Sequence, residues 1–290
     1  MWILFSLLAA FIWSCVSIVD KHVISKYNFQ PAVFLFILNS LGLIIGVIVL
    51  LFINIEFSWP IIMGLLNGAL YPTVNIFYFK AIKLEEVSRV VPWYALAPLL
   101  VVIGARIFLN EVLSLPQYAG VIMLLAGLFL LTFKKGLTIK PGKWMIFMSI
   151  SAVILATQLL LEKYLLFSLK PLQLFAAIEI GAFIGFIPYL LNDWPLIKTA
   201  LINNTKAIKV VILNELGTIS STFLMIMAIS IGLVSLVTTL NSFGYLFLLI
   251  STIIISRFYP KIIKEELRGN VISLKAAAII LIIFGIYLIS

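Results

Sequence analysis

Residues 78–132 read YFKAIKLEEVSRVVPWYALAPLLVVIGARIFLNEVLSLPQYAGVIMLLAGLFLLT, and this stretch decides the fold. It holds two apolar runs, at about residues 90–109 and 115–133, with a short polar break at Asn110 and Glu111. A run of roughly 18 or more apolar residues is long enough for a membrane helix, because the hydrocarbon core is about 30 Å thick and a helix rises about 1.5 Å per residue. The stretch therefore predicts two consecutive membrane helices joined by a short turn.

The rest of the chain repeats this pattern. Of its 290 residues, 63% are apolar and only 11% are charged, too few charges to cover a soluble domain of this length. The runs also lack the alternation of a membrane β-barrel. We therefore predict an all-α polytopic membrane protein with ten transmembrane helices in one domain, residues 1–290. The expected spans are roughly 2–20, 32–53, 60–79, 90–109, 115–133, 144–166, 172–191, 207–229, 232–256 and 271–289.

Several function classes are excluded by composition. The single cysteine, Cys15, excludes an intramolecular disulfide and a cysteine metal site, and the single histidine, His22, excludes a histidine zinc cluster. No catalytic or nucleotide-binding motif occurs in a fitting context. We expect no enzyme activity, no cofactor and no metal. The first span lacks a charged leader, and we expect a retained helix rather than a signal peptide.

The net charge of +9 is distributed unevenly. Of the 20 Lys and Arg residues, 17 lie in connections that follow odd-numbered spans, and the other face holds Arg106, Lys163 and Lys170. By the positive-inside rule this asymmetry places both termini outside the cytoplasm. The basic residues thus predict topology in a lipid bilayer, not a nucleic-acid partner.

The two halves of the chain, residues 1–133 and 144–290, resemble each other. Residues 2–21 align with 144–163 at a shift of 142, and residues 66–96 align with 213–243 at a shift of 147. An odd number of helices per half, five, requires the second half to be inverted in the membrane. Inverted repeats are a common plan of secondary transporters, whose substrate site lies near the midplane.

Two polar stripes fall on equivalent positions of the third and eighth spans. Their spacing puts each set on one helix face. Interhelical hydrogen bonding could explain them, but repeated asparagines beside tyrosines favour the lining of a cavity. The stripes are Asn67, Tyr71, Asn75 and Tyr78, and Asn214, Thr218, Ser221 and Thr222.

Aromatic and acidic residues extend this set. Trp93 and Tyr94 follow Pro92, where an interfacial aromatic belt is the alternative, whereas Asn241 and Tyr245 lie in mid-span. Glu179 and Glu215 lie deep in their spans, where a carboxylate is costly unless it meets a cation or takes a proton. Both are candidates for a coupling proton, and Glu215 also for a cationic group of the cargo. The acid–lysine neighbours at residues 20–21 and 162–163 are expected to be neutralised pairs at the interface. The alternative is a charged rim that closes each mouth of the protein in turn.

An ordered set of residues carries a family resemblance. It comprises Ala81, Val87–Ser88, Pro92, Pro98, Leu109, Glu111, Gln117, Gly120 and Gly127. The pattern resembles the closing two helices of the repeat unit in EamA-type transporters of the drug/metabolite transporter superfamily. The resemblance implies that the fourth and ninth helices line a gate and that Pro92 and Pro98 are hinges. It also implies termini inside the cytoplasm, opposite to the charge count. Many proteins of the family that this chain resembles have an arginine at one position of the second helix, and this chain has Asn39 there.

These observations predict a secondary active transporter of the cell membrane, monomeric or weakly dimeric. It would move an amino acid or similar amphipathic molecule by alternating access, as its halves rock around a central cavity. The alternatives are a flippase for a lipid-linked sugar, which needs a lateral opening, and a membrane scaffold or sensor, which needs no cavity. The expected cargo contacts are Asn67, Tyr71, Asn75, Trp93, Tyr94, Glu215, Thr218, Thr222, Asn241 and Tyr245.

Overall fold

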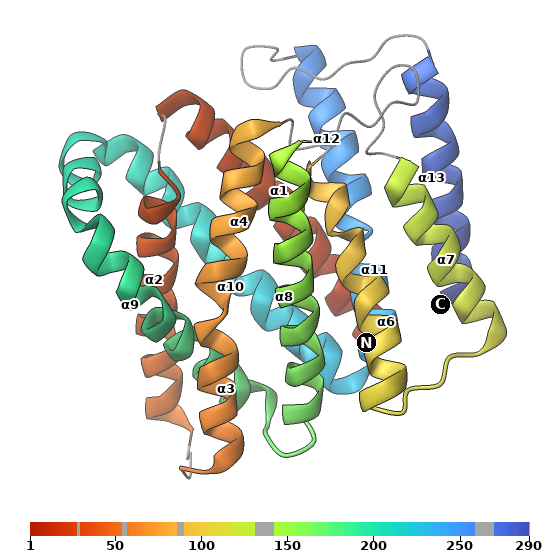
Figure 1. The fold of residues 1–290 in the computed structure, drawn as a ribbon, viewed down its shortest axis with the longest axis horizontal. Helices are drawn as coiled ribbons and strands as arrows, with labels where there is room; N and C mark the ends of the chain where they lie inside the picture. The colour runs from red at the N-terminus through yellow and green to blue at the C-terminus, as the bar shows by residue number, and fades with distance from the viewer. Residues whose placement is uncertain (28–29, 54–56, 86–89, 131–141, 259–269, 290) are drawn as a thin grey trace.

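The computed structural model describes residues 1–27, 30–53, 57–85, 90–130, 142–258 and 270–289, and these residues form helices joined by loops (Figure 1). The prediction of an all-helical fold is confirmed, since the described residues contain no strand. In chain order the elements are α1 (Trp2–Tyr27), α2 (Pro31–Phe52), α3 (Trp59–Ala69), α4 (Tyr71–Leu84), the 3₁₀ helix η1 (Val91–Ala95), α6 (Leu96–Phe108), α7 (Leu115–Leu130), α8 (Lys143–Leu165), α9 (Pro171–Asn203), α10 (Thr205–Ile231), α11 (Val234–Asn241), α12 (Gly244–Phe258) and α13 (Asn270–Ile289).

Within the described part of the chain, 6 helices are long and apolar enough to cross a membrane. They are Trp2–Ile24, Pro31–Phe52, Trp59–Leu84, Lys143–Leu165, Pro171–Asn203 and Thr205–Ile231, and shorter apolar helices cover Trp93–Phe108, Leu115–Leu130, Val234–Leu248 and Ala277–Ile289. Large apolar side chains such as Leu51, Phe108 and Leu191 are exposed on the outer faces. An apolar exterior of this kind fits lipid rather than water. The molecule is an integral, multi-pass membrane protein.

Three of the predicted spans are broken into two segments. The third span breaks at Leu70, between α3 and α4, where Pro72 in the first turn of α4 has no N–H to give to the preceding helix. The fourth begins as η1, which contains Pro92, and continues as α6, whose first turn contains Pro98. The ninth breaks between α11 and α12. Both predicted hinge prolines therefore flank a change of helix type, a feature that often marks a hinge.

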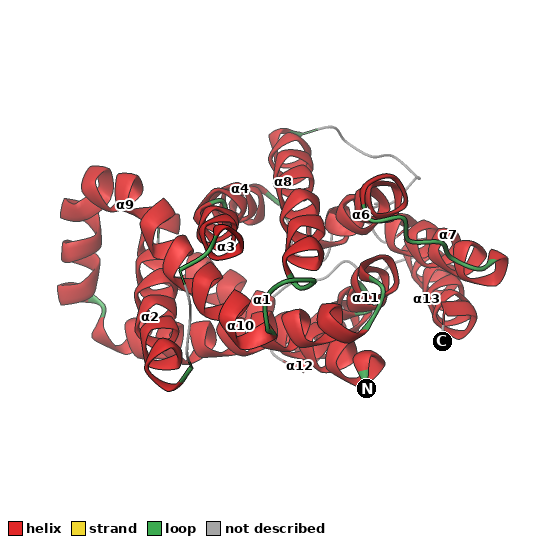
Figure 2. Cartoon of the chain, turned by 90° about the horizontal axis from the view of Figure 1, so that it is seen from below, coloured by secondary structure: helices red, strands yellow, loops and turns green. Residues whose placement is uncertain are grey.

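The helices form an elongated bundle (Figure 2). Helices α2 and α9 stand at one end, α7 and α13 stand at the other, and α1, α4, α8, α10 and α11 lie between them. At both ends of the bundle, neighbouring helices pack with their backbones close together. A Cβ at Gly68, Gly181 or Gly185 would collide with the facing backbone in the α3–α9 contact. In the α7–α13 contact, a Cβ at Gly120 would lie 2.7 Å from the carbonyl oxygen of Gly285. Small residues of this kind let membrane helices approach closely.

Candidate functional site

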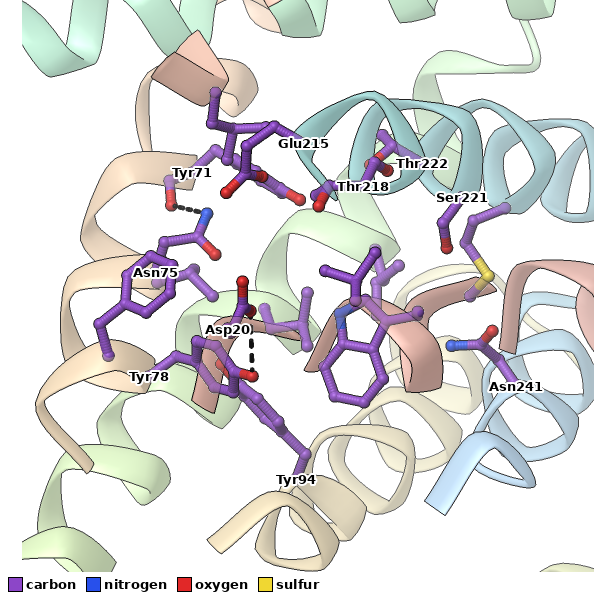
Figure 3. A pocket seen from close by; sticks show the side chains of 18 of the residues that line it. Asp20, Tyr71, Asn75, Tyr78, Tyr94, Glu215, Thr218, Ser221, Thr222 and Asn241 are labelled. Carbon is purple, nitrogen blue, oxygen red and sulfur yellow. Dashed lines mark hydrogen bonds between the residues drawn. The ribbon is translucent and has the colours of Figure 1, made fainter. Parts of the chain in front are cut away.

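A cavity of about 150 Å³ lies in the central part of the bundle, and Figure 3 shows the side chains around it. Its walls come from α1, α2, α4, α8 and α10, and from the broken spans η1–α6 and α11–α12. The lining residues are Trp13, Val16, Asp20, Leu38, Tyr71, Val74, Asn75, Tyr78, Phe79, Tyr94, Leu155, Leu159, Glu162, Glu215, Thr218, Ser221, Thr222, Met225, Asn241 and Tyr245.

One wall is the polar face of α4. Tyr71, Asn75 and Tyr78 are spaced four and three residues apart, so they point to the same side of the helix (Figure 3). The Asn75 side-chain amide donates to the backbone oxygen of Tyr71 at 3.1 Å, which fixes its rotamer. The Tyr78 hydroxyl donates to Asp20 Oδ2 at 3.4 Å. The polar stripe of α4 is thus held partly by its own helix and partly by α1.

The opposite wall is the polar face of α10. Thr222 Oγ1 donates to the carbonyl oxygen of Thr218 at 3.1 Å, and Ser221 Oγ donates to the carbonyl oxygen of Ala9 on α1 at 2.9 Å. Hydroxyls that bond one turn back along their own helix leave their lone pairs toward the cavity. Glu215 lies one turn before this group, on the same helix (Figure 3).

Four aromatic rings, three from the first half of the chain and one from the second, form a connected surface in the cavity wall. Trp13 is its centre, with ring centroids 6.3 Å from Tyr78, 6.2 Å from Tyr94 and 5.9 Å from Tyr245. Tyr78 and Tyr94 are stacked at 6.0 Å. The Tyr94 hydroxyl also hydrogen-bonds Ser151 Oγ on α8 at 2.7 Å. This group of rings is called the aromatic wall below.

Three acidic side chains line the cavity. Asp20 on α1, only 4% exposed, accepts a hydrogen bond at 2.7 Å from the Asn214 amide. Glu162 on α8 lies beside the amide of Asn67. Glu215, 2% exposed, has an Oε1 atom with no hydrogen-bond partner. An unpartnered carboxylate oxygen at this depth is costly unless the cavity supplies its partner.

The lysines that follow two of these acids have other contacts. Lys21 Nζ donates to the carbonyl oxygens of Ile82 and Glu85 at 2.6 and 3.1 Å, at the end of α4. Lys163 Nζ donates to two carbonyl oxygens at the end of α10, at 2.9 and 2.7 Å. These contacts differ from the expected acid–lysine pairs at the membrane interface, since successive residues on a helix point about 100° apart. Each acid turns inward, and each lysine caps a helix end.

Most of the cargo contacts expected from sequence lie together at the cavity. The two exceptions are Asn67 and Trp93. Asn67 is fully buried between α3 and α8, where Gln158 Nε2 donates to its backbone oxygen at 2.9 Å. Trp93 Nε1 donates to Ser149 Oγ at 3.0 Å. The residues that line the cavity as expected are Tyr71, Asn75, Tyr94, Glu215, Thr218, Thr222, Asn241 and Tyr245.

The deep acid Glu179 does not line the cavity. Its side chain packs in the contact between α9 and α2, against Gly42 and Gly46. Sequence reasoning in turn left Trp13, Asp20 and Glu162 out of the candidate site. The helical register would have included Asp20, which lies seven residues, two turns, after Trp13 and on the same face.

Comparisons with known proteins agree with this architecture. The model of the EamA-like transporter family matches residues 1–133. No curated protein matches the sequence. Among the solved structures, one whose description says only that it is a protein superimposes on this chain with a TM-score of 0.70 and 18% sequence identity. The superposition covers 99% of this chain and 97% of the other chain. That likeness extends over both halves and concerns the fold alone. The matched residues 1–133 contain the motif pattern described above, so this first half of the chain is similar to EamA-like transporters, which are membrane transporters of the drug/metabolite type.

Proposed function

We propose that this protein is a secondary active transporter of the cell membrane that moves a small metabolite, an amino acid or a similar amphipathic molecule, by alternating access. The proposal includes ten membrane spans, arranged as two inverted five-helix repeats, in a monomer or weak homodimer. The observation that carries it is the central cavity, which is built from both halves of a chain whose first half matches the model of a transporter family. Inverted-repeat transporters bind their substrates at such a position.

Repeat-equivalent residues line this cavity together, which supports a two-fold arrangement. At shifts of 142 or 147, most lining residues have their counterpart on the opposite wall. The paired lining positions are Trp13 with Leu155, Asp20 with Glu162, Tyr71 with Thr218, Val74 with Ser221, Asn75 with Thr222, Tyr78 with Met225, and Tyr94 with Asn241.

Backbone features support the same arrangement. The start of α6 at Leu96 and the break before α12 fall at equivalent positions at a shift of 147. The two lysine contacts are also equivalent: Lys21 holds Ile82 and Glu85, and Lys163 holds the residues 147 positions further on. Broken helices around a central site are typical of secondary transporters. They leave backbone groups free for cargo and permit bending.

Neither alternative function has an observation in its favour. In a scaffold or sensor, the polar stripes of the third and eighth spans would pack directly against each other. Here residues of both stripes line a cavity between them. A lipid flippase needs an opening toward the bilayer, and the labelling experiment below separates that case.

The test is thiol labelling of Thr222→Cys in a Cys15→Ser background, in sealed proteoliposomes of known orientation. Alternating access predicts labelling by a membrane-impermeant maleimide from either side, and protection by a transported solute. Ala228→Cys on the same helix is the matched control, because its side chain is fully buried and should not react. Labelling from one side only, or not at all, would contradict alternating access. Reaction only with a lipid-soluble maleimide would favour the flippase. Uptake of a radiolabelled metabolite panel then identifies the cargo.

A further inference from the structure

The ionisable side chains on the cavity wall that could carry cationic or anionic charge near neutral pH are all acidic. Asp20, Glu162 and Glu215 line it, and none of the lining residues is Lys, Arg or His. A cargo that carries a carboxylate would bring a further negative group to these three acids without a cation to receive it. Like charges in a low-dielectric space repel strongly, since their interaction is screened far less than in water.

Two buried oxygen acceptors in the cavity wall lack donors. Glu215 Oε1 and Asn241 Oδ1 have no hydrogen-bond partner, although both residues line the cavity. By contrast, Asp20 is already held by Asn214 and Tyr78. An ammonium group carries three N–H donors and no acceptor, so it can donate to both of these oxygens. Unfilled acceptors of this kind cost about 1–3 kcal/mol each when no donor arrives.

The aromatic wall supplies the second component of cation recognition. The Trp13 ring lies within 6.3 Å of the rings of Tyr78, Tyr94 and Tyr245, and the Tyr78 hydroxyl donates to Asp20. A cation within about 6 Å of an aromatic centroid is attracted by the ring quadrupole, most strongly where water is excluded. The same rings pack against the apolar body of a small amine.

A metal ion fits this cavity less well than an organic cation. Among the described residues, no group of three or more His, Cys, Asp or Glu side chains is placed to hold a metal ion. The volume of about 150 Å³ equals that of a protein cavity that admits benzene. The cargo group is therefore small, about the size of one ring or a short aliphatic chain with a cationic head.

We infer that the cavity selects a small organic cation, a primary amine without a carboxylate, whose ammonium group binds Glu215 and whose apolar body packs on the aromatic wall. This inference rests on the proposed function and narrows its cargo from amphipathic metabolites in general to amines. It therefore excludes the amino acids that the sequence pattern had suggested.

The test uses four ligands that share one ring and differ in charge. Benzylamine is the cation, benzyl alcohol the neutral analogue, benzoate the anion, and phenylglycine is benzylamine with an added carboxylate. Binding to the purified protein in detergent is measured by calorimetry. We expect benzylamine to bind at least about 30-fold more tightly than phenylglycine, since an unpaired buried charge costs about 2 kcal/mol or more. Benzoate should not bind measurably.

The matching protein variant is Glu215→Gln, which keeps the shape and removes the charge. It should weaken benzylamine binding about 30-fold or more while changing benzyl alcohol binding less than about threefold. Asp193→Asn is the control, because that carboxylate lies outside the cavity, where it accepts a hydrogen bond from Asn192. If Glu215→Gln melts more than a few degrees below the unmodified protein, Glu162→Gln takes its place with the same expectation.

The outcomes separate this inference from the proposed function. Phenylglycine binding as tight as benzylamine binding, or variants that leave the benzylamine preference unchanged, would overturn the choice of an amine even if amino acids are transported. Benzylamine binding without uptake or two-sided labelling would support the inference and overturn alternating access instead.

Discussion

Replacing Glu111 with alanine should remove the cap of a helix that belongs to the other half of the chain. The Glu111 carboxylate accepts hydrogen bonds from the backbone N–H of Val234 at 2.8 Å, and from the N–H and hydroxyl of Ser235 at 3.1 and 2.7 Å. These groups form the first turn of α11, where N–H groups have no partner within the helix. The carboxylate also meets the positive end of the helix dipole.

The expected loss of stability follows from the orphaned groups. Alanine would leave two backbone N–H groups without acceptors in a site that is buried, and each costs about 1–2 kcal/mol. Losing the contact to the helix dipole adds up to about 1 kcal/mol. The sum is about 3 kcal/mol, which corresponds to roughly 6 °C in melting temperature for a chain of this size. Glu111→Gln keeps one acceptor oxygen, and we expect about one third of that shift.

The assay is thermal unfolding in detergent, followed by the fluorescence of the 6 tryptophans. Val112→Ala is the matched control, because Val112 is in the same loop and is 65% exposed. The reasoning is refuted if Glu111→Ala melts within about 1 °C of the unmodified protein, or if Val112→Ala lowers the melting temperature as much.

Three further predictions follow from the packing and the charge distribution. Gly68→Ala should prevent accumulation of folded protein, since its Cβ would collide with the α9 backbone. Gly217→Ala, whose Cβ would meet only two side-chain methyl groups, should be recovered in the folded state, and size-exclusion chromatography of detergent extracts checks both. Asn67→Leu should lower the melting temperature by about 3 °C or more, because it removes the side-chain amide that donates to the backbone oxygen of Gln158 at 3.5 Å in a buried contact. Ligand affinity should be retained in the folded fraction, and loss of affinity at unchanged melting temperature would instead place Asn67 among the cargo contacts. A C-terminal reporter should be active only outside the cytoplasm, as the distribution of Lys and Arg predicts, and cytoplasmic activity would reverse that orientation.

Most of the helices could be predicted, because a membrane helix requires a long run of apolar residues. The ends of the helices and the breaks within them were harder to predict. The seventh apolar run stops near residue 191, yet α9 continues through the polar Asn192 and Asp193 to Asn203. A helix keeps its backbone hydrogen bonds whether it lies in lipid or in water. Hydropathy therefore predicts the part of a helix that lies in the hydrocarbon core, not where the helix ends. The breaks beside Pro72 and Pro92 fall where proline lacks the backbone N–H that would continue the preceding helix.

The candidate site was predictable where helical periodicity alone decides the direction of a side chain. Tyr71, Asn75 and Thr218 were found in this way. Asn67, one turn from Tyr71, lies instead between α3 and α8, because the helix breaks at Leu70 and shifts the face of the preceding segment. Asp20 was missed because a neighbouring lysine suggested an ion pair. Sequence does not reveal that the lysine finds carbonyl partners on another helix.

The close contacts of the bundle do not follow the division of the chain into halves. Helix α3 is locked to α9 by facing glycines, and α7 is locked to α13 in the same way. Each contact joins one helix from residues 1–133 to one from residues 144–290. Backbones that touch without intervening side chains have nothing to repack, so each pair moves as one piece. In the proposed alternating-access cycle, each moving body therefore combines helices from both halves of the chain. If the chain were cut between α7 and α8, the two pieces would still be held together by the α3–α9 contact at one end of the bundle and the α7–α13 contact at the other.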